Sequence, residues 1–177
     1  MRRKSKEYVI YKYKPEYYGE DGYTLNEWTD FCDIGKTFYD GILTKEEYLK
    51  WENRYLSALR DIAEACGCQF LTIRYLSVFP KSLKTDLKKS PFSEDASLGL
   101  PYFLSLHEEQ RLTLGNAIEV FRFGMRNYIN VSLANRSHLF RCYMGNEFYL
   151  HLFIPLTEST ISEISKRYHL HYGRRFI

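Results

Sequence analysis

The clearest hydrophobic pattern in the chain begins at Thr44 and predicts a long amphipathic helix. Thr44 and Glu47 have the spacing of a capping box, in which each side chain satisfies a backbone N–H that lacks a helical partner. Apolar residues then recur at helical spacing and form one stripe: Tyr48, Tyr55, Leu59, Ile62, Ala63 and Cys66. Gly67 follows directly and can adopt the left-handed conformation that ends a helix. We therefore expect a helix from Thr44 to about Cys66.

Alternating apolar and polar residues, with turn residues between them, predict several strands around this helix. A second helix should begin at a Thr113 cap and run to about Asn127. Strands are expected at residues 6–14, 69–79, 128–133, 138–143, 147–154 and 168–176, and a third helix at 157–167. Residues 28–41 read as irregular with a single helical turn, and residues 80–101 have no clear pattern. The prediction is one domain, residues 1–177, with an α+β fold: a mostly antiparallel β-sheet with about three helices packed on one face.

One carboxylate falls on the apolar stripe of the first helix. Glu52 lies in line with Tyr48, Tyr55 and Leu59. A buried carboxylate needs a cationic or hydrogen-bonding partner, since burial without one is costly. Arg122 or Arg126, on the second predicted helix, is the expected partner.

Charge is distributed unevenly along the chain, although the formal net charge is only +3. Residues 1–15 carry a local excess of five positive charges and residues 166–177 an excess of four. Residues 16–33 contain six carboxylates and no Lys or Arg. The N-terminus lacks the apolar run of a signal peptide, and no window approaches a membrane span, so a cytoplasmic protein is expected. Four cysteines in 177 residues do not form a disulfide scaffold.

Two kinds of chemistry can be weighed from side chains alone. His169 and His171 share one face of a predicted strand, with His151 on another, which could suit zinc, but no third ligand follows from the spacing. A metal-independent ribonuclease or RNA-binding protein would use the basic termini together with imidazole and guanidinium groups. The candidates for it are His138, Arg141, His151, His169 and Arg174. No nucleotide-binding, nucleophile-elbow or zinc-protease motif is present, so we expect no cofactor and no metal.

The segment Glu27-Trp28-Thr29-Asp30-Phe31-Cys32-Asp33-Ile34-Gly35-Lys36, followed by the helix that starts with Leu43-Thr44-Lys45-Glu46-Glu47-Tyr48-Leu49, carries a resemblance to a known family. It resembles the immunity proteins of bacterial polymorphic-toxin systems, including contact-dependent growth inhibition. Residues 122–133 and 145–151 are similar to later units of that family, whereas Asn127 stands where an acidic residue is expected. The resemblance implies a protein without catalytic activity that binds and blocks a cognate toxin domain, expected to be a nuclease. It implies no direct contact with nucleic acid or membrane.

Within the resembling segment, structural roles are expected for three residues. Trp28 should anchor the segment in the core, Asp33 should accept hydrogen bonds from local backbone N–H groups, and Gly35 should permit a turn. Glu52 and Arg126 are the other two residues expected to serve the fold. For toxin recognition we favour the acidic, Tyr-rich segment just before, because an inhibitor of a basic nuclease offers carboxylates and rigid aromatics; a solvated acidic loop is the alternative. Its candidate partner-binding residues are Tyr17, Tyr18, Glu20, Asp21, Tyr23 and Glu27.

Overall fold

A seven-stranded antiparallel sheet forms the centre of the computed structural model, which describes residues 5–14, 27–145 and 148–174. The strands lie in the order β5-β4-β6-β7-β8-β1-β9, and every neighbouring pair is antiparallel. Their bounds are β1 Lys6–Tyr11, β4 Phe70–Val78, β5 Arg111–Thr113, β6 Ile129–Ala134, β7 Arg141–Met144, β8 Leu150–Ile154 and β9 His171–Gly173. The expected meander of β6, β7 and β8 is present.

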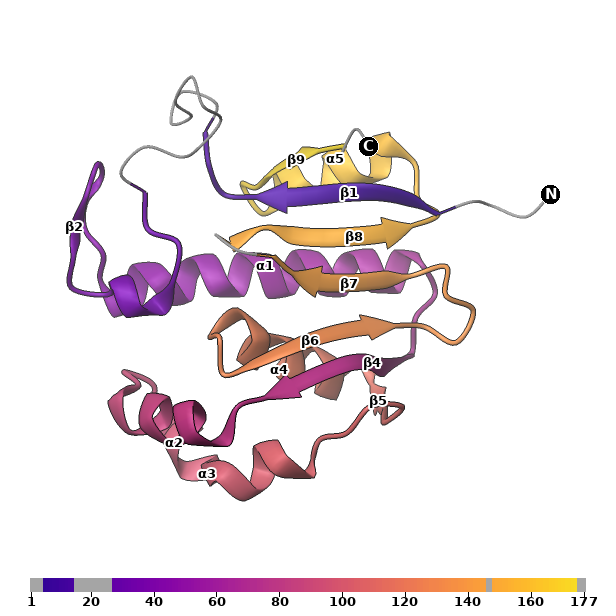
Figure 1. The fold of residues 1–177 in the computed structure, drawn as a ribbon. Helices are drawn as coiled ribbons and strands as arrows, with labels where there is room; N and C mark the ends of the chain where they lie inside the picture. Colours follow the sequence, from indigo (N-terminus) through magenta and orange to yellow (C-terminus); the bar gives the residue numbers. More distant parts are fainter. Residues whose placement is uncertain (1–4, 15–26, 146–147, 175–177) are drawn as a thin grey trace.

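Three helices cover one face of this sheet, and the other face carries no helix among the described residues (Figure 1). They are α1 (Lys45–Ala65), which lies behind the middle strands, α4 (Leu114–Met125) behind β4 and β6, and α5 (Glu158–Arg167) behind β1 and β9. Each begins at a threonine whose hydroxyl accepts a hydrogen bond from a backbone N–H of the first turn: Thr44, Thr113 and Thr157. Gly67, just beyond α1, has the expected positive φ of +73°.

The core lies between the sheet and these helices. Alternate residues of β1, Tyr8 and Ile10, are fully buried, as are Leu150, Leu152 and Ile154 of the neighbouring β8. The predicted stripe of α1 is buried against them, including Tyr48, Tyr55, Leu59, Ile62 and Ala63. Period-two strands and a period-3.6 helix therefore bury the faces that their sequence patterns predict.

The fold class is confirmed, but the helix count is not: the described residues contain five α-helices rather than about three. The additional helices, α2 (Pro80–Lys89) and α3 (Ser93–Ser105), fill the segment that had no clear pattern and lie beside the β4–β5 end of the sheet (Figure 1). Only Leu83 and Leu87 of α2 are buried. The helix therefore shows a single i, i+4 repeat of apolar residues, too little for the sequence to indicate it. Gly99 interrupts α3 with a φ of +69°, and Pro101 follows inside it.

A small hairpin also departs from the prediction of an irregular segment. The hairpin consists of the antiparallel strands β2 (Thr37–Phe38) and β3 (Gly41–Ile42). A single 3-10 turn, Phe31–Asp33, precedes it. The turn matches the expected single helical turn. In the described part of the chain, no helix has the length and apolar character needed to cross a membrane.

Candidate functional site

The residues of the Trp28–Lys36 segment build the entry to α1. Trp28 is 6% exposed, and its ring packs against Phe148 and Tyr48 at centroid distances of 5.2 and 5.6 Å. Asp33 accepts a hydrogen bond from the backbone N–H of Thr29 at 3.0 Å. Gly35 has a φ of +92°, which side-chain-bearing residues rarely adopt. All three therefore lie where a structural role requires them.

A side-chain hydrogen bond also joins this segment to the end of α4 through Asn127. Asn127 ends α4 in a left-handed conformation, with a φ of +53°. Its side-chain amide donates a hydrogen bond to the carboxylate of Asp30, which also caps the 3-10 turn. A second carboxylate at position 127 would repel Asp30, whereas the amide joins the end of α4 to the segment.

A buried ionic cluster connects α1, α3 and the end of α4. The guanidinium of Arg126 donates to both carboxylate oxygens of Glu52 at 2.7 Å and to Asp95 at 2.6 Å. It also lies 3.7 Å from the centre of the Phe92 ring. The contact expected between Glu52 and an arginine of the second helix is confirmed. Asp95 was not among the predicted partners, because it lies in α3, within the segment that had no clear sequence pattern.

Burial and mutual contact shift the pKa values of Glu52 and Arg126 in this cluster. Burial raises the pKa of Glu52 above its ordinary value, although the hydrogen bonds and positive charge of Arg126 act in the opposite direction. Burial disfavours the charged form of Arg126, but its hydrogen bonds to Glu52 and Asp95 outweigh that and raise its pKa. Both groups serve the fold, since Arg126 is 2% and Glu52 1% exposed.

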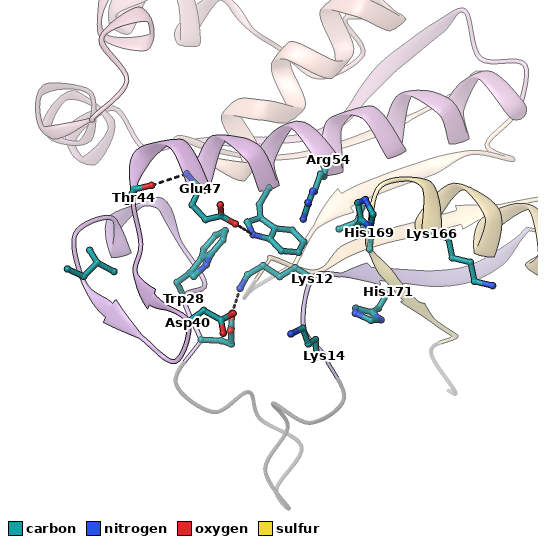
Figure 2. Close-up of a pocket in the computed structure, with 14 residues that line it drawn as sticks. Lys12, Lys14, Trp28, Asp40, Thr44, Glu47, Arg54, Lys166, His169 and His171 are labelled. Atoms are coloured by element: carbon teal, nitrogen blue, oxygen red, sulfur yellow. Dashed lines mark hydrogen bonds and ion pairs between the residues drawn. The ribbon is translucent and has the colours of Figure 1, made fainter.

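A groove of about 990 Å³ lies beside the start of α1 (Figure 2). We call it the Trp51 groove. It lies between the β2–β3 hairpin with the first turn of α1 on one side, and the end of β1, α5, β9 and Arg54 of α1 on the other. Its lining includes Lys12, Lys14, Glu27, Trp28, Asp40, Ile42, Thr44, Glu47, Trp51, Arg54, Lys166, His169, Leu170 and His171.

The floor of the groove is a buried ion pair. Lys12 is 5% exposed, and its ammonium lies 4.0 Å from the centre of the Trp28 ring and pairs with Glu27. Burial lowers the pKa of Lys12, and the hydrogen bond and charge of Glu27 oppose that shift. The side chain of Glu27 is only 8% exposed. Glu27, a candidate partner-binding residue, therefore belongs to the floor of the groove rather than to its exposed rim.

The two walls of the groove differ in charge. Asp40, Thr44 and Glu47 lie on the hairpin side, and a carboxylate oxygen of Glu47 accepts a hydrogen bond from the Trp51 indole at 2.9 Å (Figure 2). The opposite wall is basic, and we call it the basic wall. Its members are Lys14, Arg54, Lys166, His169 and His171.

The other candidate partner-binding residues, Tyr17, Tyr18, Glu20, Asp21 and Tyr23, lie outside the described residues. The chain leaves the described structure at Lys14 and returns at Glu27, and both of these residues line the Trp51 groove. The described residues on either side of the acidic, Tyr-rich segment in the sequence therefore both belong to the groove.

The hairpin beside the groove exposes two large apolar side chains that the sequence analysis did not single out. Tyr39 is 71% and Ile42 64% exposed, the two highest values among the large hydrophobic residues that the structure describes. The Asp40-Gly41 pair is a turn signal that could have identified this hairpin, and Gly41 has a φ of +113°.

The residues considered for ribonuclease or zinc chemistry are mostly dispersed. His151 stacks on Tyr143 at 4.6 Å on the helix-free face of the sheet, and His138 lies 3.2 Å from Arg74. Arg141 lies near the Phe153 ring, and Arg174 pairs with Glu158. Only His169 and His171 share the groove. Within the described ranges, no three His, Cys, Asp or Glu residues are grouped to hold a metal ion.

The cysteines take no part in the groove. All four lie in the described part of the chain and are free thiols: Cys32, Cys66, Cys68 and Cys142. Burial raises the pKa of the Cys66 thiol to about 12, so this side chain stays protonated and unreactive near neutral pH.

With this geometry established, the chain was compared with known proteins. No protein-family model, curated protein or solved structure matches it.

Proposed function

We propose that this protein is an immunity protein that binds a cognate toxin domain, a nuclease, and blocks its active site. The observation that carries the proposal is the β2–β3 hairpin, which holds Tyr39 and Ile42 out of the fold at 71% and 64% exposure. Large exposed apolar side chains on a fixed element are a feature of protein–protein interfaces, and tyrosine is enriched among the residues that dominate binding energy.

Charge near the hairpin fits a basic partner. Asp40, Glu46 and Glu47 lie on the hairpin and the first turn of α1. Lys14 and Glu27, which flank the acidic segment 16–26 in the sequence, line the groove beside them. A nuclease presents a cationic surface to its phosphate substrate, so an acidic surface with aromatic anchors can occupy that surface. Such complementarity speeds association and weakens as salt screens the charges.

The test uses a candidate toxin domain, taken from a gene adjacent to the one for this chain. Induction of that domain should stop growth, and co-expression of this protein should restore it and yield a stable complex. The Tyr39→Ala/Ile42→Ala variant should stay folded, because both side chains are exposed, but should lose protection through faster dissociation. Tyr75→Ala is the matched control, since Tyr75 is 51% exposed on β4, far from the hairpin.

Two results would count against this assignment. Full protection by the hairpin variant, or equal loss with Tyr75→Ala, would place the interface elsewhere. The acidic segment is tested separately: Glu20→Lys/Asp21→Lys should slow association and flatten its salt dependence. A complex in which residues 16–27 face solvent would remove the segment from the interface and leave the immunity function standing.

A metal-independent ribonuclease is the second candidate, and one observation favours it. His169 and His171 line the same groove as Lys14, Arg54 and Lys166, which brings proton-transfer groups next to cations that could hold phosphate. Incubation with total RNA in the presence of a chelator decides between the candidates. RNA cleavage that is abolished by His169→Ala or His171→Ala would favour the ribonuclease over the immunity protein. Intact RNA would favour the immunity protein.

A further inference from the structure

The basic wall of the Trp51 groove gathers cationic and imidazole groups from separate parts of the chain. Lys14 follows β1, Arg54 lies on α1, Lys166 on α5, and His169 and His171 at the start of β9. Figure 2 shows Arg54, His169, His171 and Lys14 around the open side of the groove. The sequence brings these groups together only through the pairing of β1 with β9 and the packing of α5 beside α1.

Two carboxylates of the groove, Glu27 and Glu47, have partners outside the basic wall. Glu27 pairs with Lys12 in the floor, and Glu47 accepts from the Trp51 indole and pairs with Lys50. Arg54 lies over the Trp51 ring at 4.4 Å. Across the described residues, no ion pair neutralises Arg54 or Lys166. Cations without counter-ions in a concave surface attract anions, because the walls focus their field.

We propose that the basic wall is a binding site for a small phosphate ester with a hydroxylated body, such as a sugar phosphate or a mononucleotide. Arginine and lysine supply charge-assisted hydrogen bonds to a phosphate, and imidazole N–H groups can add to them. The volume of about 990 Å³ is in the range of small-ligand sites. This inference does not depend on the proposed immunity function.

The carboxylates on the hairpin side of the groove favour a ligand with a single phosphate over a nucleic-acid strand. Asp40 and Glu47 line the hairpin side of the same groove. A nucleic-acid strand carries a phosphate at every residue and would bring some of them against these carboxylates. A ligand with one phosphorylated end places its charge on the basic wall and offers hydroxyl donors to the carboxylate side.

The test is a titration of the full-length protein followed by ¹H–¹⁵N NMR spectra. The probes are inorganic phosphate, ribose 5-phosphate, AMP, adenosine and a short RNA oligonucleotide. Ribose 5-phosphate and AMP should shift the amides of residues 12–14, 51–54 and 166–171, and adenosine should not. Arg54→Gln should weaken binding about tenfold or more, as expected for a lost charge-assisted hydrogen bond. Arg60→Gln, an exposed arginine on α1 outside the groove, is the matched control.

Absent shifts with both esters, or equal weakening by Arg60→Gln and Arg54→Gln, would overturn the site. Inorganic phosphate binding as tightly as the esters would overturn the assignment of a hydroxylated body. If the RNA oligonucleotide bound more tightly than the monoesters, the ligand of the site would be a nucleic-acid strand and not a phosphate monoester. Lys166→Gln repeats the test at an exposed side chain, in case Arg54→Gln disturbs the fold through Trp51.

Discussion

Replacement of Arg126 by methionine should be among the most damaging single changes in this protein. Methionine keeps much of the volume but leaves the carboxylates of Glu52 and Asp95 without the cation that holds them. Arg126 donates three short hydrogen bonds, two to Glu52 at 2.7 Å and one to Asp95 at 2.6 Å. The remaining cation, Arg122, lies 3.6 Å from Glu52 and is 29% exposed.

The expected loss is about 3–5 kcal/mol, the cost of removing one partner from a buried ion pair. The sum of three charge-assisted hydrogen bonds would be larger, but such contributions are not additive, and Arg122 compensates in part. For a chain of this length, 1 kcal/mol corresponds to roughly 2–4 °C in Tm, so a fall of about 6–20 °C is expected.

The loss should depend on pH in a defined direction. Burial already raises the pKa of Glu52 above its ordinary value, and removal of the guanidinium raises it further. A group whose pKa is raised by folding favours the folded state below its unfolded pKa, and that contribution is lost as pH rises through the folded pKa. The variant should therefore be closest to the wild type near pH 4.5 and fall behind it as pH increases.

Urea denaturation of both proteins from pH 4.5 to 8 measures this effect. Arg122→Met is the matched control on α4 and should cost less than about 1 kcal/mol, because Arg122 is partly exposed. Glu52→Gln added to Arg126→Met should recover part of the loss by removing one stranded charge. A loss below about 1 kcal/mol for Arg126→Met, or a larger loss at acid pH, would refute this account of the cluster.

Three further changes test other parts of the fold. Trp28→Ala should cost about 3–5 kcal/mol in denaturation, because the ring is buried; unchanged stability with lost toxin binding would make Trp28 an interface residue. Thr44→Ala should cost about 1 kcal/mol through loss of the α1 cap, with Thr85→Ala, exposed on α2, as the neutral comparison. Gly35→Ala should cost about 1–2 kcal/mol from its positive φ alone, since no atom lies within 4 Å of the added Cβ; a neutral result would contradict the conformational reason.

Local patterns predicted the parts of the fold that depend on neighbouring residues. The threonine caps and the stripe of α1 were identified because each is determined within a few turns of helix. The Glu52–Arg126 contact was identified because a carboxylate on a buried stripe needs a cation. Asp95 was missed because Gly99 and Pro101 interrupt its helix and obscure the periodicity.

The groove could not be predicted in the same way. Its lining extends from Lys12 to His171, and these ends of the chain meet only because β1 pairs with β9. Strand patterns identify the strands but not their order in the sheet. The exposure of Tyr39 and Ile42 was equally hidden, because a six-residue hairpin shows too little alternation to indicate which side faces solvent.

The position of β1 also determines when the protein can begin to work. This first strand lies between β8 and β9, so both of its hydrogen-bonded neighbours come from the last part of the chain. At about 5–20 residues per second, β1 leaves the ribosome many seconds before its partners are made. During that interval an apolar strand has both edges unpaired, and Lys6 and Lys12 at its ends are charges that discourage association with other chains. Only chains synthesised as far as β9 can close the sheet, so the supply of active protein follows the synthesis of β9 rather than that of β1.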